Sequence, residues 1–164
     1  MNTSTTFTAI TNLTGGSGTD TLTGRNATNA WSITGANAVT LDGMAATSMN
    51  ALVGNAGADT FTLGAAVTTF SGSIAGGGGT DTLAAGNVSN AWVSTGTNAG
   101  TLNTSTSFSA ITNLAGGTGT DTLTGRNTTN AWSITGANVV TLDGMAATSM
   151  NALVGNAGAD TFTL

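Results

Sequence analysis

The sequence contains no His, Cys, Lys, Glu, Gln, Tyr or Pro, and its charged residues are two Arg and seven Asp. Catalysis by general acids and bases near neutral pH usually draws on these missing types, and only Asp remains. Nucleophile pairs of the Ser-His or Cys-His kind cannot be assembled. Most zinc sites need His or Cys, so the inventory suits only a hard, oxygen-binding cation such as calcium. We therefore expect a protein that is not an enzyme.

The charge balance and the lack of long apolar runs exclude two further classes of partner. The formal net charge is −5, which repels the phosphates of nucleic acid. No run approaches the roughly 18 apolar residues that a membrane span needs. We expect neither a nucleic-acid partner nor a membrane span. The absence of Cys does not fix the compartment, because disulfide-free secreted proteins are ordinary.

The residues that are present form internal repeats. Residues 2–63 recur as residues 103–164 with six substitutions, all between small residues. This predicts a single solenoid over residues 1–164, built from a 101-residue unit (2–102) and a partial second unit. Met1 stands where the period places a Leu. We expect the chain to be an excerpt of a longer exported protein, extracellular or on the cell surface.

A finer period lies inside this unit. Thr followed by Leu or Phe recurs at eight places, 19 to 22 residues apart: Thr21, Thr40, Thr60, Thr82, Thr101, Thr122, Thr141 and Thr161. Apolar and polar residues alternate around each place, which indicates short strands, and Gly and Asn clusters come too often for helices. We predict an all-β fold, a β-solenoid (parallel β-helix) of about eight rungs of roughly 20 residues.

In such a solenoid the eight Thr would form one unbroken outward ladder that could serve assembly. Regular Thr arrays on flat solenoids also resemble ice-binding surfaces, although the neighbouring column is interrupted by Asp, Ala and Asn. The alternative is that β-branched Thr fits a solvent-facing strand without further function. Trp31 alternates with Ile33 and Trp132 with Ile134, so we expect both in the core rather than on a sugar-binding platform. Trp92 has the polar Ser94 as its alternate partner, which supports the core less directly, and we still favour the core for all three.

A Gly-rich segment is the clearest motif. The stretch "GGSGTDTLTG" at residues 15–24 returns with small changes at 54–63, 76–85, 116–125 and 155–164. Its pattern, Gly-Gly/Asn-x-Gly-x-Asp-x-Leu/Phe-x, resembles the nonapeptide of the repeats-in-toxin calcium-binding family. The resemblance implies turns that hold calcium through backbone carbonyls and the Asp carboxylate. The alternative is that Gly supplies the positive φ of a tight corner and Asp caps the turn through its own backbone.

The spacing departs from that family, in which nonapeptides follow one another without a break. Here only residues 54–59 and 76–81 are expected on neighbouring rungs. Asp59 and Asp81, with neighbouring carbonyls, are therefore the first candidate ligands for calcium. The weaker candidates are Asp20, Asp121 and Asp160. No cofactor is required by the sequence, and calcium is the one that it allows.

A second resemblance concerns the whole chain. Stretches such as "FTAITNLTGGSGTDTLTG" and "NAWSITGANAVTLDG" look like the tandem β-strand repeats of large bacterial surface proteins of the filamentous-haemagglutinin and adhesin type. This resemblance implies secretion and a role as stalk or fibre. The first rung also resembles residues 64–83, which would naturally follow the last rung. Leu164 of one molecule would then lie near residues 1–10 of the next.

Three functions follow from these observations. The leading one is a structural extracellular module that stacks head to tail into a filament, with a second copy of itself as partner, or forms the shaft of an adhesin. The alternative keeps the fold but makes calcium or ice binding the purpose of the protein. A β-helical polysaccharide lyase is the least favoured, because clustered Asp alone offers no obvious base or charge stabiliser.

Overall fold

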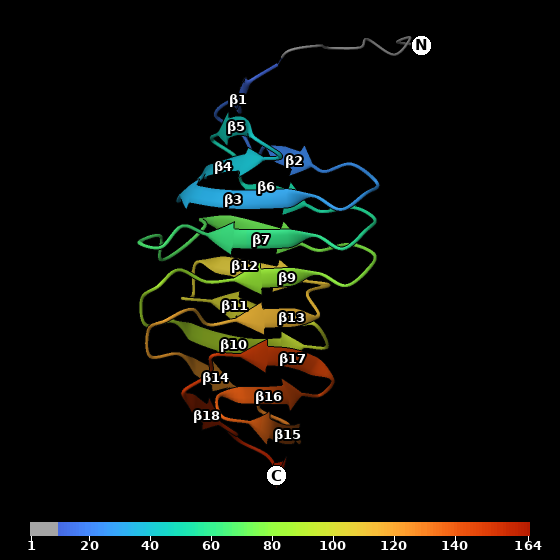
Figure 1. Ribbon diagram of the computed structural model, residues 1–164, viewed down its shortest axis with the longest axis vertical. Coiled ribbons are helices and arrows are strands. Elements are labelled where there is room, and N and C mark those ends of the chain that lie inside the picture. The colour runs from blue at the N-terminus through green and yellow to red at the C-terminus, as the bar shows by residue number, and fades with distance from the viewer. Residues whose placement is uncertain (1–9) are drawn as a thin grey trace.

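The computed structural model describes residues 10–164, which form an elongated stack of short strands with the segment of residues 12–14 and the C-terminus at opposite ends (Figure 1). None of these residues is helical, which agrees with the all-β prediction, and none forms a helix that could cross a membrane. The predicted contact of Leu164 with residues 1–10 of another molecule involves residues 1–9, which lie outside the described range.

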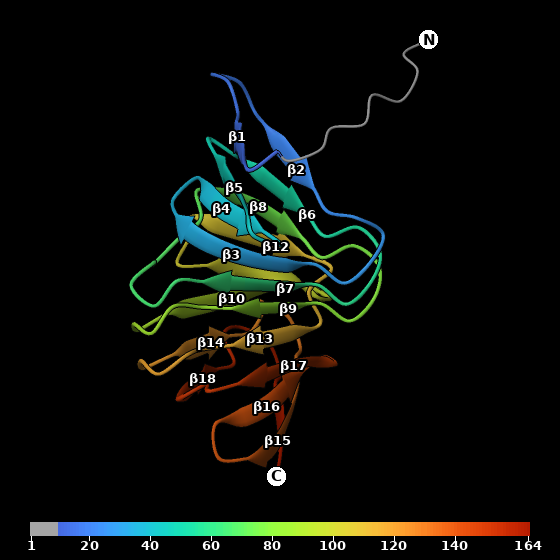
Figure 2. The same ribbon diagram turned by 45° about the horizontal axis from the view of Figure 1, so that its top comes forward.

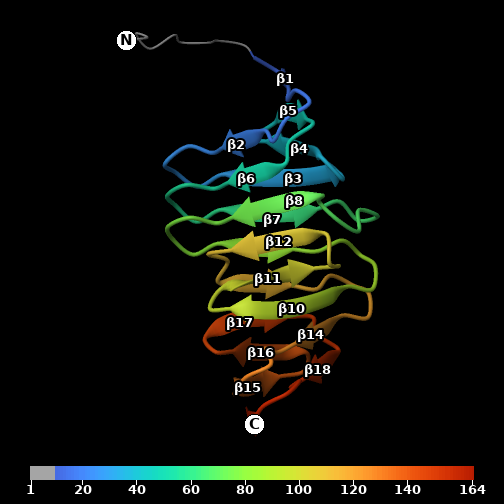
Figure 3. The same ribbon diagram turned by 180° about the vertical axis from the view of Figure 1, so that it is seen from behind.

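Two sheets face each other along the stack. The eleven-stranded sheet has the spatial order β1 (Asn12–Thr14), β5 (Met44–Thr47), β4 (Ala38–Leu41), β3 (Ala30–Gly35), β7 (Thr60–Leu63), β9 (Thr82–Ala84), β13 (Asn113–Ala115), β17 (Met145–Thr148), β16 (Val139–Leu142), β15 (Ala131–Gly136) and β19 (Thr161–Thr163). The eight-stranded sheet has the order β2 (Thr21–Thr23), β6 (Ala51–Val53), β8 (Gly72–Ala75), β12 (Thr106–Ser109), β11 (Ala99–Leu102), β10 (Ala91–Gly96), β14 (Thr122–Thr124) and β18 (Ala152–Val154). Figures 2 and 3 show the second sheet behind the first and from its own side.

The predicted β-solenoid is confirmed, but its coils are longer than predicted. The chain makes about five turns of about 30 residues, not eight rungs of 20. Strand pairing shows this directly, since Leu22 is the partner of Leu52 and Trp31 is the partner of Phe61.

The shorter period arises from antiparallel hairpins inserted into the coil. Strands β3, β4 and β5 form one antiparallel set, as do β10 to β12 and β15 to β17. Asp42 and Gly43 form the turn between β4 and β5 with φ values of 47° and 89°, and Asp-Gly is a preferred pair where both turn residues need positive φ. Thr40, Thr101 and Thr141 lie on the middle strands of these sets, so the spacing counted hairpin strands as rungs.

The hairpins also fill gaps in the stack. The chain places β3 three positions from β1 in the sheet and then turns back, so that β4 and β5 occupy the positions between them. The last strand of the set, β5, pairs in parallel with β1. The same path is repeated where β12 pairs with β8 and β17 with β13. Each hairpin set therefore joins two coils that are already separated in the stack.

The predicted Thr ladder is wrong. Thr60 and Thr82 are direct partners, but Thr21 faces Ala51, and Thr122 faces Ala91 and Ala152. The eight Thr are divided between two sheets and between parallel and hairpin strands. Because the coil is about 30 residues long, a spacing of about 20 residues does not bring each Thr to the next position of one column.

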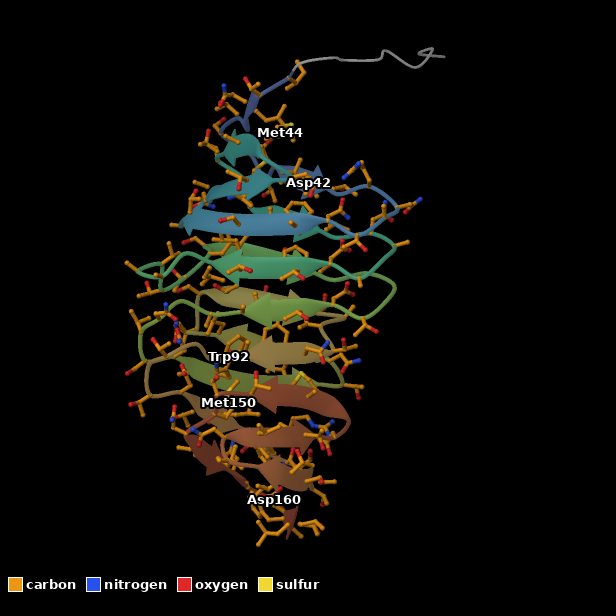
Figure 4. All side chains as sticks on the ribbon, in the orientation of Figure 1. Asp42, Met44, Trp92, Met150 and Asp160 are labelled. Atoms are coloured by element: carbon orange, nitrogen blue, oxygen red, sulfur yellow. The ribbon has the colours of Figure 1, made fainter. Side chains whose placement is uncertain are left out.

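Aromatic pairs fill the space between the sheets, and the prediction that the three Trp lie in the core is confirmed. Trp31, Trp92 and Trp132 are each no more than 2% exposed. Trp31 stacks on Phe61 with ring centroids 5.2 Å apart, and Trp92 meets Phe108 edge to face at 6.0 Å. Figure 4 shows Trp92 within the middle of the stack. The sheets are thus held together by buried rings as well as by aliphatic side chains.

Candidate metal-binding turns

The Gly-rich segments form the corners where the chain crosses from one sheet to the other. We call a corner turn a six-residue link that connects a strand of one sheet to a strand of the other and ends with Asn or Asp. The eight corner turns of the described chain are residues 15–20, 24–29, 54–59, 76–81, 85–90, 116–121, 125–130 and 155–160. Three of them, 24–29, 54–59 and 76–81, protrude one above another on the right of Figure 1.

The last residue of each corner turn is its cap, and four caps, Asp59, Asp81, Asp121 and Asp160, accept a hydrogen bond from the coil above. Asp59 Oδ1 accepts a hydrogen bond from the Asn29 backbone N–H at 2.8 Å, and Asp81 Oδ1 accepts one from the Asp59 N–H at 2.8 Å. In the opposite row of corners, Asp121 Oδ1 accepts from the Asn90 N–H at 3.0 Å. The cap side chains therefore satisfy backbone donors of the neighbouring coil and fix the vertical register of the corners.

The other carboxylate oxygen of the Asp caps has no such partner. Within the described residues, Oδ2 of Asp20, Asp59, Asp81 and Asp121 is buried and receives no hydrogen bond. Three of these residues, Asp59, Asp81 and Asp121, are completely buried. Burying a carboxylate oxygen without a hydrogen-bond donor costs free energy. A positively charged partner at each of these oxygens would offset that cost.

Burial also changes the titration of these groups. It raises the pKa of Asp81, and the negative charge of Asp59 raises it further, while the hydrogen bond from the Asp59 backbone opposes both. Burial likewise raises the pKa of Asp121, against the hydrogen bonds from Asn90. Both carboxylates are therefore disfavoured as anions in the protein without a bound cation.

Each orphaned oxygen lies close to a carbonyl oxygen of the next coil, around the first glycine of the turn. A methyl group on Gly54 would collide with both Asp59 Oδ2 and the Gly76 carbonyl oxygen, far inside van der Waals contact. The same crowding of one carboxylate and one carbonyl oxygen occurs around Gly15, Gly76 and Gly116. Only glycine fits there, and the oxygens that surround it are the hard ligands that calcium takes. The residues present therefore fit calcium.

The turns at 54–59 and 76–81 are direct neighbours, as expected from the sequence. Ala56 and Gly78 form a parallel bridge, with the Gly57 N–H donating to Gly78 O at 2.9 Å and the Gly78 N–H donating to Asn55 O at 2.8 Å. Asn55 replaces the second glycine of the motif and has a φ of 81°, a conformation that Asn tolerates better than most residues. This step brings two Asp caps, Asp59 and Asp81, into contact.

The weaker candidates lie in different surroundings. Asp20 stands over Asn50, whose Oδ1 accepts from the Asp20 N–H at 3.0 Å, and Asp121 stands over Asn151 in the same way at 2.8 Å. Asp160, in the last coil and near the lower end of the stack in Figure 4, is only partly buried. No group of three or more acidic side chains occurs in the described part of the chain, so a cation here must take most of its ligands from backbone carbonyls.

Three caps that the sequence reasoning missed are Asn29, Asn90 and Asn130. They are buried, and each stands directly over an Asp cap, which is Asp59, Asp121 and Asp160 respectively. A signal was present in the sequence. "GRNATN" at 24–29 has the same length, and the same position before a strand, as "GNAGAD" at 54–59.

The two Asp outside the corner turns already have cationic partners. Asp42 and Asp143 lie in the hairpin turns and form ion pairs with Arg25 (2.5 Å) and Arg126. These pairs use both Arg of the sequence, so the five other Asp, all in corner turns, account for the net charge of −5. The sequence has no Lys or further Arg that could neutralise them.

Comparison with known proteins points to the same turns. Residues 11–29, 73–90 and 110–128 match the model of the RTX calcium-binding nonapeptide repeat. The matched segments contain Asp20, Asp81 and Asp121, whereas turn 54–59, with Asn55 in place of glycine, is not matched. No curated protein and no solved structure matches the chain, and nothing supports the resemblance to filamentous-haemagglutinin adhesins. The chain is thus a β-solenoid, and three of its segments resemble the RTX calcium-binding nonapeptide repeat.

Proposed function

We propose that the protein is a calcium-binding β-solenoid module in which cations at the Asp-capped corners stabilise the stack. The observation that carries the proposal is the set of buried carboxylate oxygens without donors at equivalent places in Asp20, Asp59, Asp81 and Asp121. A net charge that resides wholly in the corner turns, with no basic side chain left to neutralise it, supports an external cation. The match of three segments to a calcium-binding repeat supports calcium as that cation.

The step between Asp59 and Asp81 is the principal site of this proposal. It offers two carboxylates, the carbonyl oxygens gathered around Gly54 and Gly76, and almost no access for water. Bound calcium would supply the positive charge that these oxygens lack. The protein's own contribution is to hold the two caps in line through the hydrogen bond from the Asp59 N–H to Asp81 Oδ1. Asp20, Asp121 and Asp160 would provide weaker sites, each with a single carboxylate.

The proposed location is extracellular. Sites with only one or two carboxylates suit the affinity range of extracellular calcium modules, roughly 10⁻⁴–10⁻³ M. The narrow chemistry of the sequence further supports a structural and binding role rather than catalysis. An exported protein would use such a module as a segment that becomes rigid when it meets calcium outside the cell.

A calcium titration of the whole chain tests this function. Calcium is expected to bind in isothermal titration calorimetry and to raise the melting temperature of the β-sheet signal in circular dichroism. Magnesium is the matched control, because it demands near-octahedral geometry and dehydrates reluctantly. Absence of calcium binding, or an equal response to both ions, would overturn the proposal.

We propose end-to-end stacking as a second function, because one observation favours it. Strand β19 pairs with β15 on one side only, and Phe162 on it is 48% exposed, whereas the equivalent Phe61 is completely buried. The partner would be a second copy of the chain, which would cover this edge as part of a filament or shaft. Sedimentation velocity over a concentration series, with calcium and with a chelator, tests it, and a monomer at all concentrations would refute it.

A further inference from the structure

Corner turns end in either an Asn cap or an Asp cap, and the cap occupies the same place in both kinds. The Asn cap presents a hydrogen-bond donor there, whereas the Asp cap presents an acceptor. A methyl group on Gly24 would lie 2.9 Å from Asn29 Nδ2 and 2.8 Å from the Gly54 carbonyl oxygen. Asn29 Nδ2 therefore occupies, beside Gly24 and the Gly54 carbonyl oxygen, the position that Asp59 Oδ2 occupies beside Gly54 and the Gly76 carbonyl oxygen. An amide that can donate replaces an oxygen that cannot.

The amide nitrogen of each Asn cap lies inside a ring of four oxygens. Asn90 Nδ2 is 3.1 Å from Gly86 O, 2.7 Å from Val88 O, 3.0 Å from Gly116 O and 2.7 Å from Asp121 Oδ1. The same four kinds of acceptor surround Asn29 Nδ2 (Arg25 O, Ala27 O, Gly54 O and Asp59 Oδ1) and Asn130 Nδ2 (Arg126 O, Thr128 O, Gly155 O and Asp160 Oδ1).

This ring has more acceptors than an amide can satisfy. An NH₂ group carries two hydrogens, yet four oxygens, one of them from a carboxylate, point at the nitrogen. Such an environment is one that favours positive charge. In the Asp-capped turns the same region holds a carboxylate oxygen beside a carbonyl oxygen and contains no donor.

We propose that Asn29, Asn90 and Asn130 act as built-in substitutes for calcium, so that cations bind only where the upper turn of a corner step ends in Asp. The inference rests on the proposed calcium function and specifies which steps carry it. The steps Asn29 over Asp59, Asn90 over Asp121 and Asn130 over Asp160 are closed by the amide and need no metal. The column of cations is thereby interrupted, and part of every row of corners stays locked when calcium is absent.

The test converts a closed step into an open one. Asn90→Asp places a carboxylate over Asp121, which reproduces the arrangement of Asp59 over Asp81. In chelator the melting temperature is expected to fall by about 5–10 °C, because several buried hydrogen bonds are lost and two carboxylates face each other. In calcium the loss is expected to disappear, and titration calorimetry should count one more calcium ion per chain than in the unchanged protein.

Two controls separate the new site from general effects. Asn90→Ala removes the amide without adding a carboxylate, so it should lower the melting temperature in chelator and in calcium alike. Asn87→Asp adds the same charge to the same turn at an exposed position, so it should leave the number of bound calcium ions unchanged. An unchanged ion count in Asn90→Asp, while the parent protein binds calcium, would overturn the inference.

The reverse substitution keeps the inference testable if Asn90→Asp does not fold. Asp59→Asn should close the step over Asp81, raise the melting temperature in chelator and remove one calcium ion. If Asp59→Asn retains the full ion count, the inference fails while the calcium function stands. If the parent protein binds no calcium at all, the proposed function fails instead. A calcium response that appears only in Asn90→Asp would still support the role of the amide.

Discussion

Substitution of Asp81 by Asn is the most direct test of the principal site. The change keeps the shape of the side chain and removes one negative charge from a buried position next to Asp59. The amide oxygen of the new side chain can still accept the hydrogen bond that the Asp59 N–H donates to Asp81 Oδ1 in the unchanged protein. We therefore expect the corner to remain folded while its affinity for calcium falls to that of the weaker sites with a single carboxylate.

The expected size of the effect follows from linkage. A ligand present at about 100 times its Kd stabilises the folded state by about 2.7 kcal/mol. In a protein of this length, 1 kcal/mol corresponds to a change of roughly 2–4 °C in melting temperature, so this site alone accounts for a rise of about 5–10 °C. Asp81→Asn should lose that rise and keep only the contribution of the weaker sites. In chelator the variant should be as stable as the parent or more so, because burial and the charge of Asp59 disfavour the Asp81 anion.

Thermal melts followed by circular dichroism, in chelator and in saturating calcium, measure both quantities. Asp42→Asn is the matched control, because it also removes one carboxylate charge but lies in a hairpin turn that pairs with Arg25. The control should keep the full calcium response and lose no more than about 1 kcal/mol, since its ion pair is largely exposed. A full calcium response in Asp81→Asn would refute the assignment of the site.

Three further predictions follow from the structure. Because the folded pKa of Asp81 lies above its unfolded value of about 4, the folded state holds its proton longer, so stability in chelator should rise as the pH falls from 7 toward 4. Saturating calcium should reverse this trend, because the ion needs the ionised carboxylate, and melts at several pH values measure both. Gly54→Ala should destabilise the protein by more than about 2 kcal/mol in urea unfolding, since its methyl group would collide with buried oxygens, whereas Gly16→Ala, with open space, should stay within about 0.5 kcal/mol. Phe61→Ala should cost about 3–5 kcal/mol and Phe162→Ala clearly less, unless stacking of chains buries Phe162.

The sequence predicted the class of fold because a solenoid stacks like residues, and repetition of the pattern is visible without coordinates. It also predicted, from their positions on consecutive rungs, that 54–59 and 76–81 are neighbours. That prediction is confirmed because no hairpin set lies between the two turns and the coil there is short. The coil length was wrong for a local reason. Asp42-Gly43 is a strong hairpin signal, but its flanking Thr-Leu pair repeats the spacing of the parallel strands and was counted as another rung.

The Asn caps escaped prediction for a different reason. Asn is abundant throughout the chain, and the motif of the Gly-rich turn is defined by its Asp. Only the stacking of one turn on the next shows that Asn29 reaches both the carbonyls of its own turn and the carboxylate of Asp59. A partner that lies 30 residues away in the sequence, and whose position depends on an inserted hairpin, leaves no local pattern.

The distribution of charge explains why a chain with so few ionisable groups mixes two kinds of corner. Both Arg are used by Asp42 and Asp143 outside the corners, so every Asp cap adds a buried or half-buried negative charge that no side chain neutralises. A row of corners built from Asp alone would place carboxylates at the coil spacing of about 4.8 Å, where they repel one another in a medium that screens poorly. Asn at Asn29, Asn90 and Asn130 replaces that repulsion with hydrogen bonds. The number of Asn caps relative to Asp caps then sets both the stability without calcium and the response to calcium. A single exchange of Asp for Asn, which replaces one oxygen by nitrogen, changes both properties.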